Sequence, residues 1–151
     1  MKLKELFKKT EQRNTCSAVI VAAGSAQRMG ADKVMLELGC MPVLARTLLA
    51  FQNCDAIDEI IVVTRMEKVE EVASLCKKYG VTKVGKVIRG GKTRMESALA
   101  GVSEARSGAK LIAIHDGARP FVTDEVIHRT VDAAAAYMSA VPVIYSTDTL
   151  K

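Results

Sequence analysis

The sequence predicts an α/β fold, in which helices flank a mostly parallel sheet. Short apolar runs typical of buried strands alternate along the 151 residues with stretches whose apolar residues recur every three or four positions, as in helices. Strands that alternate with helices form parallel sheets with right-handed crossovers. In such sheets ligands bind beyond the carboxyl ends of the strands, so functional residues are expected there.

Five segments are predicted to be strands. Residues 17–22, with the sequence SAVIVA, form a continuous apolar run of the kind found in strands that are covered on both faces. The other predicted strands are residues 59–64, 83–89, 111–114 and 140–144. Pro142 interrupts the last of these strands.

Four helices are predicted between and after these strands. Pro42 opens the first helix, and Gly80 caps the carboxyl end of the second. Thr93 and Glu96 have the spacing of a capping box at the start of the third, and the fourth extends from about residue 124 to residue 137. The predicted buried residues of the four helices are, in order, Leu44, Leu48 and Phe51; Val69, Val72, Ala73 and Cys76; Met95, Ala98, Leu99 and Val102; and Val126, Ile127, Thr130, Val131 and Ala134.

Residues 1–15 are predicted to be a basic extension that precedes a single domain. Residues 1–14 carry five basic residues against two acidic ones, and so hold +3 of the net charge of +5. The remaining +2 is not interleaved with aromatic residues, so a nucleic-acid-binding surface is not expected. Leu3, Leu6 and Phe7 give the extension a short amphipathic period, which is too short to favour membrane contact.

Further classes of protein are disfavoured by the composition. No apolar stretch approaches the ~18–20 residues that span a bilayer, and no apolar run follows the first lysines as in a secretory signal. The four cysteines, at positions 16, 40, 54 and 76, have neither CxxC spacing nor a neighbouring histidine pair. Buried or semi-buried thiols in a reducing cytoplasm are therefore favoured over disulfides or zinc ligands.

The first candidate site follows the strand at residues 17–22. Ala22, Ala23, Gly24 and Ser25 are small enough for the backbone to approach a ligand closely, and successive N–H groups in such a loop bind anions. Arg28 and Lys33 add two positive charges, which suits a triphosphate. The loop has neither the Walker A nor the GxGxxG pattern. The structural alternative is a tight turn with two solvated basic residues.

The second candidate site begins at Gly90-Gly91 and continues through Lys92 into the helix capped by Thr93. Free N–H groups and the positive end of the helix dipole are expected to face the ligand. Arg94 and Ser97 share a helix face, where the hydroxyl is a candidate for reading a base edge and Arg94 for bracing the first loop. The alternative is a capped helix with an exposed arginine.

The third candidate site is the segment His115-Asp116-Gly117-Ala118-Arg119-Pro120. A carboxylate that faces a phosphate-lined cleft is well placed to hold Mg²⁺, because phosphate oxygens of a nucleotide complete the octahedron. In the structural alternative, Arg119 pairs with Asp116. His115 is expected to satisfy its hydrogen bonds in the core rather than act as an acid or base, and His128 is expected to lie on a helix surface.

Taken together, these segments resemble the methylerythritol-phosphate cytidylyltransferases. That family has an AAGxGxRM loop with a following lysine, then GGxxRxxS, then HDxARP. Residues 140–151 resemble the family's next strand and its DT[ILM]K segment. Each motif alone is weak, but four motifs in register, from about residue 16 to the end of the chain, are highly specific.

The resemblance implies a Rossmann-like nucleotidyltransferase fold whose C-terminal part is missing, with residues 16–151 as the N-terminal portion of one domain. It implies transfer of CMP from CTP to 2-C-methyl-D-erythritol 4-phosphate with release of pyrophosphate, Mg²⁺ as cofactor, a cytoplasmic location, and a homodimer at full length. Arg28 and Lys33 are the implied catalytic residues. The implied binding residues are Ala22, Ala23, Gly24, Ser25, Gly91, Ser97, Asp116 and Thr149, with Asp116 also as the metal ligand. Lys92 and Arg94 are added as predicted binding residues because they belong to the second candidate site.

The sequence also departs from the family pattern. Ala26 stands where the family has its second glycine, the stretch between Arg28 and Lys33 is short, and Lys92 stands where an acidic or polar residue is common. The family's dimerisation arm and further substrate-binding cations would follow Lys151, so the 151-residue chain alone is expected to be inactive. Two alternatives stay open: a ribitol-5-phosphate cytidylyltransferase, which Ala118 and the AAGS loop disfavour, and a truncated, non-catalytic nucleotide-binding fragment.

Overall fold

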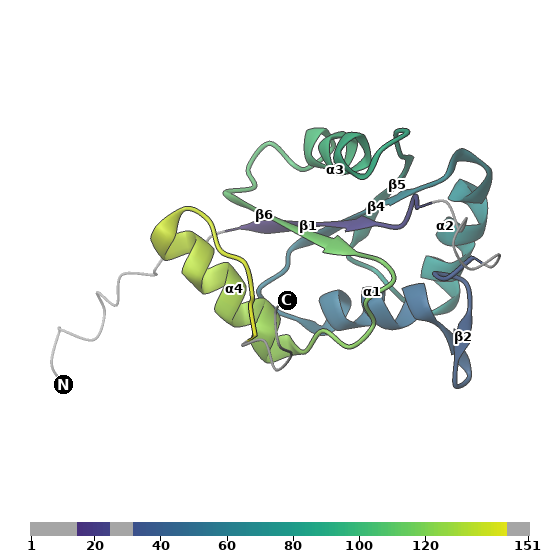
Figure 1. Ribbon diagram of the computed structural model, residues 1–151, viewed down its shortest axis with the longest axis horizontal. Helices are drawn as coiled ribbons and strands as arrows, with labels where there is room; N and C mark the ends of the chain where they lie inside the picture. Colours follow the sequence, from purple (N-terminus) through teal and green to yellow (C-terminus); the bar gives the residue numbers. More distant parts are fainter. Residues whose placement is uncertain (1–14, 25–31, 145–151) are drawn as a thin grey trace, which may run out of the picture.

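A computed structural model describes residues 15–24 and 32–144, and it has the predicted architecture (Figure 1). Four parallel strands form a sheet in the order β5-β4-β1-β6, and β2 and β3 form a separate antiparallel hairpin that was not predicted. The strands are β1 (Cys16–Val21), β2 (Glu37–Leu38), β3 (Met41–Pro42), β4 (Glu59–Thr64), β5 (Val84–Arg89) and β6 (Leu111–Asp116). The helices are α1 (Val43–Asn53), α2 (Val69–Lys78), α3 (Arg94–Ser103) and α4 (Asp124–Tyr137), with a short 3-10 helix, η2 (Met66–Lys68).

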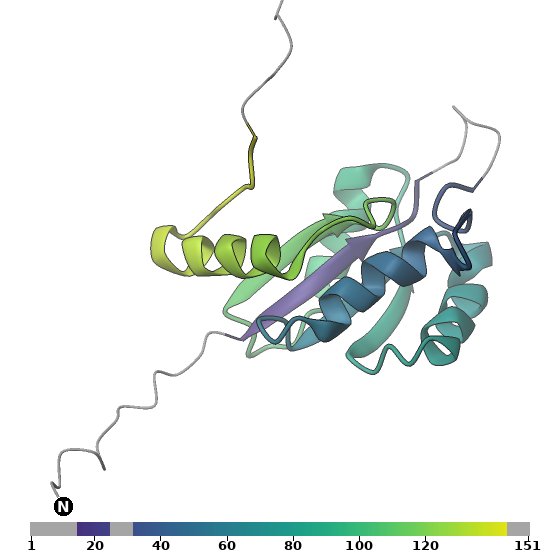
Figure 2. The same ribbon diagram turned by 90° about the horizontal axis from the view of Figure 1, so that it is seen from below.

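The sheet is covered on both faces, which gives three layers. α3 lies on one face, while α1, α2 and α4 pack on the other (Figures 1 and 2). Successive side chains of a strand point to opposite faces, so Ala18 and Ile20 of β1 join the core under α1, and Val19 and Val21 join the core under α3. β1 is buried along its whole length, as its continuous apolar run predicts.

The predicted helix ends are also present. Thr93 accepts a hydrogen bond from the Glu96 N–H at 3.1 Å, and the Glu96 side chain accepts one from the Thr93 N–H at 3.2 Å, which completes the capping box. Gly80 has a φ of +67°, the left-handed conformation that a glycine cap after α2 supplies without strain. Pro42 immediately precedes α1.

The predicted buried face of α3 is right for Ala98 and Val102, which pack on the core, and wrong for Met95 and Leu99. Met95 and Leu99 are 78% and 64% exposed, whereas the buried residues of this helix are Ser97, Ala98 and Gly101. A Cβ atom added to Gly101 would lie 2.3 Å from Cγ1 of Val19 in β1, so the helix backbone rests directly on the sheet. Small residues allow this approach, and the larger apolar residues are left on the outer side.

The strand predicted at residues 140–144 is not formed. Val141, Val143 and Ile144 are 80%, 86% and 95% exposed, and residues 139–144 have no regular structure. A strand requires a hydrogen-bonded neighbour, and in the described part of the chain β6 pairs only with β1. The apolar sequence of this segment therefore does not suffice to make it a strand here.

The cysteines follow the prediction except for one. Cys16, Cys54 and Cys76 are buried, but Cys40 is exposed in the turn between β2 and β3, and all four are free thiols. Because the β2–β3 hairpin was not predicted, the exposure of Cys40 could not be predicted either. In the described residues, none of the helices is both long enough and apolar enough to cross a membrane.

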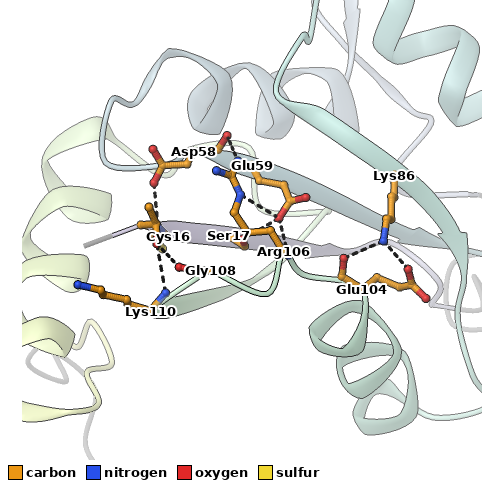
Figure 3. A network of polar contacts seen from close by, with 10 residues as sticks. Cys16, Ser17, Asp58, Glu59, Lys86, Glu104, Arg106, Gly108 and Lys110 are labelled. Atoms are coloured by element: carbon orange, nitrogen blue, oxygen red, sulfur yellow. Dashed lines mark hydrogen bonds and ion pairs between the residues drawn. The ribbon is translucent and has the colours of Figure 1, made fainter. Parts of the chain in front are cut away.

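A polar network ties the amino ends of the strands together (Figure 3). The Ser17 hydroxyl donates to Oε2 of Glu59 at 2.7 Å, and the backbone N–H of Arg106 donates to the same oxygen at 3.0 Å. Burial alone would raise the pKa of Glu59, but these two hydrogen bonds and the charges of Arg106 and Lys86 outweigh it, so the pKa lies below its ordinary value. Glu59 is therefore ionised at neutral pH, and its carboxylate joins β4 to β1 and to the loop after α3.

Candidate active site

Three loops meet at the carboxyl edge of the sheet. The first residue after β1, β5 and β6 still donates a hydrogen bond to the neighbouring strand, which fixes where each loop begins. Ala22 N–H donates to Val63 O at 2.7 Å, and Gly117 N–H donates to Val21 O at 2.8 Å. Gly90 N–H donates to Thr64 O, also at 2.8 Å. The strand order β5-β4-β1-β6 thus brings the loops after β1, β5 and β6 to one place, as the rule for open α/β sheets predicts.

A cleft of about 850 Å³ opens between these loops. It is lined by every predicted site residue that the structure describes: Ala22, Ala23, Gly24, Lys33, Gly91, Lys92, Arg94, Ser97 and Asp116. The remaining predicted site residues, Ser25, Arg28 and Thr149, lie outside the described residues. The sequence motifs are therefore parts of one concave surface, although they come from three separate loops.

Cations outnumber anions on the described lining of the cleft. Four basic side chains, those of Lys33, Lys92, Arg94 and Arg119, stand against the carboxylates of Asp32 and Asp116. A cleft lined mainly by one sign of charge focuses the electrostatic potential and raises the local concentration of ligands of the opposite sign. This arrangement suits a small, highly anionic ligand.

The glycine pair after β5 is required by close packing. A Cβ atom on Gly90 would lie 2.6 Å from Cβ of Ala23, and one on Gly91 would lie 2.3 Å from Cβ of Glu96. Real Cβ atoms do not approach other atoms so closely, so larger residues would push the loop after β5 away from both the loop after β1 and helix α3. Gly90 and Gly91 thereby set the width of the cleft.

The amides of this second loop do not form the anion site that the sequence suggested. Gly91 N–H donates to Oγ of Ser97 at 3.1 Å, and the N–H groups of Lys92 and Thr93 donate to Oε2 of Glu96 at 2.6 and 3.2 Å. The Ser97 hydroxyl itself donates to Thr93 O at 2.9 Å and is buried. Because these groups already bond one another at the start of α3, Ser97 shapes the loop, and the attraction for an anion comes from basic side chains.

Asp116 lies between two arginines. Oδ1 accepts two hydrogen bonds from Arg94, at 3.0 Å from Nε and 2.8 Å from Nη2, and Oδ2 is 3.1 Å from Nε of Arg119. Arg94 therefore joins the loop after β5 to the loop after β6, while residues 25–31 of the first loop, which Arg94 was predicted to brace, lie outside the described residues. The predicted alternative pairing of Arg119 with Asp116 is confirmed.

Sequence reasoning missed Arg65, which follows the carboxyl end of β4. It forms an ion pair with Asp32, whose carbonyl oxygen accepts hydrogen bonds from Met35 and Leu36 in the turn that contains Lys33. Arg65 also lines a second cavity of about 690 Å³, which shares Ala23, Gly91 and Lys92 with the main cleft. Its position at a strand's carboxyl end was the available signal, because every predicted site loop occupies such a position.

His115 has the expected structural role. Its Nε2 lies 3.1 Å from Arg119 O, and its ring packs at a tilt against Phe51, with 4.9 Å between ring centres. Burial, partly opposed by the Arg119 carbonyl and the Asp116 charge, lowers its pKa below the ordinary value. The neutral imidazole supports the loop that carries Asp116.

Comparison with known proteins agrees with this geometry. Residues 16–151 match the family described as "IspD: 2-C-methyl-D-erythritol 4-phosphate cytidylyltransferase". The 2-C-methyl-D-erythritol 4-phosphate cytidylyltransferase of Halalkalibacterium halodurans is 42% identical over 137 residues, which cover 89% of this chain and 60% of the relative. The crystal structure of 4-diphosphocytidyl-2C-methyl-D-erythritol synthase from Anaerococcus prevotii superposes with a TM-score of 0.69 and 33% identity, over 80% of this chain and 50% of that chain.

A more distant structure shares the fold. A Mycobacterium tuberculosis H37Rv protein, solved in complex with manganese, is 18% identical and has a TM-score of 0.64 over 82% of this chain and 61% of that chain. The chain spans about 60% of the length of the curated relatives that it matches. The family match, the shared nucleotidyltransferase fold and the single cleft lined by all three motifs lead to the same assignment. The chain belongs to the 2-C-methyl-D-erythritol 4-phosphate cytidylyltransferase family.

Proposed function

We propose that the protein transfers CMP from CTP to 2-C-methyl-D-erythritol 4-phosphate and releases pyrophosphate. The observation that carries this proposal is the cleft at the carboxyl edge of the sheet, where small-residue loops and four basic side chains surround a space of about 850 Å³. Those features suit a nucleoside triphosphate, which is polyanionic and needs close backbone approach. Membership of the family supports the choice of the two substrates.

In this reaction an oxygen of the acceptor's phosphate attacks the α-phosphorus of CTP. A new P–O bond forms to that oxygen, the bond from the α-phosphorus to the bridging oxygen breaks, and pyrophosphate leaves with the electron pair. The attacking oxygen is already ionised at neutral pH, so no general base is required. Catalysis then consists of aligning the two phosphates and stabilising the charge on their oxygens.

The residues that we assign to this task come from two loops. Lys33, and Arg28 outside the described residues, are proposed to stabilise negative charge on the phosphoryl oxygens in the transition state. Ala22, Ala23, Gly24 and Ser25 are proposed to contact the nucleotide through their backbone, and Gly91, Lys92, Arg94 and Ser97 to form the opposite wall. Thr149 is proposed to lie on the acceptor's side.

Asp116 is the proposed ligand of Mg²⁺. Both hydrogen bonds from Arg94 go to Oδ1, whereas Oδ2 is in an ion pair with Arg119, so Oδ2 is the oxygen that we propose contacts the cation. Mg²⁺ is commonly held by one or two carboxylates together with substrate phosphates, so a single protein oxygen fits this ion. A bound Mg²⁺ would neutralise phosphate charge, while Arg94 and Arg119 keep the carboxylate oriented toward the cleft.

The setting of the protein is proposed from its composition, its thiols and its family. Residues 1–15 are proposed to be an extension of a single nucleotidyltransferase domain. A cytoplasmic location is supported by the four free thiols, which suit a reducing compartment. A homodimer is proposed from the family resemblance.

The function is tested by incubating the native gene product with CTP and Mg²⁺ and measuring the pyrophosphate that is released from CTP. Parallel reactions contain 2-C-methyl-D-erythritol 4-phosphate, ribitol 5-phosphate or no acceptor. We expect turnover with the first acceptor only. Turnover with ribitol 5-phosphate alone would move the protein to the other cytidylyltransferase, and CTP binding without turnover on either acceptor would make it a nucleotide-binding protein.

A further inference from the structure

A second group of polar side chains lies between helices α1 and α4, apart from the residues that line the cleft. Cys54 ends α1, and Asp124 and His128 lie on the first turns of α4. The Cys54 sulfur, a carboxylate oxygen of Asp124 and a ring nitrogen of His128 all lie within 4.8 Å of one another. The two helices pack against each other on the same face of the sheet (Figures 1 and 2).

From this juxtaposition we infer that Cys54, Asp124 and His128 bind a structural Zn²⁺ ion that clips α4 to α1. Thiolate, imidazole and carboxylate are the three ligand types that Zn²⁺ takes in proteins, usually in tetrahedral geometry. Ligand atoms at tetrahedral Zn²⁺ lie about 3.3–3.8 Å apart, so atoms within 4.8 Å need only a small contraction. This inference does not depend on the chemistry proposed for the cleft.

The fourth ligand position has a candidate in Asp55. Its Oδ1 lies 2.9 Å from Nε2 of His128, and the nearest Asp124 oxygen lies 3.7 Å from the same nitrogen. The side chain of Asp55 is 82% exposed, so it is free to adjust its position, and water can replace it. Two carboxylates and a thiolate would supply three negative charges, which offsets the unfavourable position of a cation at the amino end of a helix.

The group is also reachable from solvent. Cys54 is fully buried, whereas the side chains of His128 and Asp124 are 37% and 65% exposed. The thiol therefore forms the floor of the group and the other ligands form its open side. An incoming ion would displace the thiol proton.

A bound ion would stabilise the position of α4, which packs weakly on the rest of the protein. α4 has 14 residues, but only Ile127 among them is buried, and Val126, Val131 and Ala134 border an open groove beside β6. A helix with so little buried surface gains little stability from packing. A metal ion at its first turns would anchor it to α1, which belongs to the main core.

The test uses cobalt and zinc on the protein with Cys40→Ser, which removes the exposed thiol. Co²⁺ bound by a thiolate absorbs in the near ultraviolet, and tetrahedral Co²⁺ has visible bands, so the spectrum reports both the sulfur ligand and the geometry. We expect one equivalent of Co²⁺ to give both signals and Zn²⁺ to displace it. We also expect Zn²⁺ to raise the melting temperature.

Ligand variants decide the location. His128→Gln and Asp124→Asn, both at partly exposed positions, should each lower Zn²⁺ affinity by at least ~10–100-fold and abolish the rise in melting temperature. Cys54→Ser should remove the near-ultraviolet band, whereas the matched control Cys76→Ser, another buried thiol, should retain it. Asp116→Asn should also leave Zn²⁺ binding unchanged, which separates this group from the cleft.

The inference is overturned if no cobalt–thiolate band forms, or if the band survives His128→Gln with unchanged affinity. Loss of the band in Cys76→Ser with retention in Cys54→Ser would likewise place the metal elsewhere. Should Cys54→Ser fail to fold, the His128 and Asp124 variants still decide the outcome, because neither side chain is buried.

Discussion

The guanidinium of Arg65 forms an ion pair with the carboxylate of Asp32, the residue immediately before Lys33. Arg65 follows β4, so this contact ties the turn that carries Lys33 to a strand at the centre of the sheet. The side chains of both partners are mostly buried, at 28% and 22% exposure. We therefore regard Arg65 as a positioning residue for Lys33 in the proposed reaction.

In a full-length version of the protein, Arg65→Ala is expected to lower kcat about tenfold to hundredfold while changing the KM for CTP little, because misplacing a catalytic group by about 1 Å costs that much. Arg65→Lys should restore part of the loss. The measurement is steady-state kinetics with Arg129→Ala, an exposed arginine on α4, as the matched control. Wild-type kcat in Arg65→Ala would show that the ion pair does not position Lys33.

In a full-length version of the protein, Lys33→Ala is expected to reduce kcat by about 10²–10³, the effect of removing one charged or hydrogen-bonding group aimed at a transition state. CTP affinity should fall much less, because Lys33 is one of four basic side chains on the described cleft lining. Kinetics and direct CTP binding separate the two effects, with Lys77→Ala on α2 as the control. A raised KM with unchanged kcat would assign Lys33 to ground-state binding instead.

CTP is expected to be preferred over UTP by roughly tenfold to hundredfold in kcat/KM. Cytosine presents an amino donor where uracil presents a carbonyl, and an unmade buried hydrogen bond costs about 1–3 kcal/mol. Backbone carbonyls of the loops at Ala22–Gly24 and Gly91 are the proposed acceptors. Competition between the two nucleotides in the pyrophosphate assay measures the ratio, and equal efficiencies would refute this base pocket.

Gly91→Ala is expected to destabilise the protein by about 1–3 kcal/mol, the usual cost of overpacking. The added Cβ would lie 2.3 Å from Cβ of Glu96, whose carboxylate holds the N–H groups of Lys92 and Thr93. Urea unfolding provides the measurement. Gly108→Ala is the matched control, because no atom lies within 4 Å of a Cβ there, and equal effects of the two substitutions would contradict the packing argument.

The contribution of Glu59 to stability is expected to depend on pH. Its pKa in the folded protein lies below the ordinary value of 4.5, so its stabilising effect is fully present above that value and is lost as the pH falls through the folded pKa. Glu59→Gln should therefore be less stable than wild type at pH 7, and the difference should shrink below about pH 4.5.

Urea unfolding across pH 3–8 would reveal this trend for Glu59. Glu125→Gln, at a side chain that is 78% exposed, should show almost no difference at any pH. A gap between Glu59→Gln and wild type that stays constant down to pH 3 would mean that the ionised carboxylate does not stabilise the amino ends of the strands.

The sequence by itself determined the features that depend on neighbouring residues. Apolar runs predicted β1, β4, β5 and β6 to within about two residues at each end, and the Thr93–Glu96 spacing predicted the cap of α3. Parallel strands in turn predicted that the site loops would share one edge, and all nine described site residues line one cleft there. These signals are local, because secondary structure and caps depend on spacings of two to four residues.

Tertiary structure decided what depends on partners distant in the chain. The buried face of α3 follows from the fit of Gly101 against Val19, which hydrophobic periodicity cannot reveal. Likewise, only the folded chain brings Arg65 to Asp32 and His128 toward Cys54. Which polar groups pair depends on how elements pack, and the same side chain has several possible partners until that packing is known. The spacing of residues therefore predicted the location of the candidate site, while the packing of the loops determined which side chains contact one another in it.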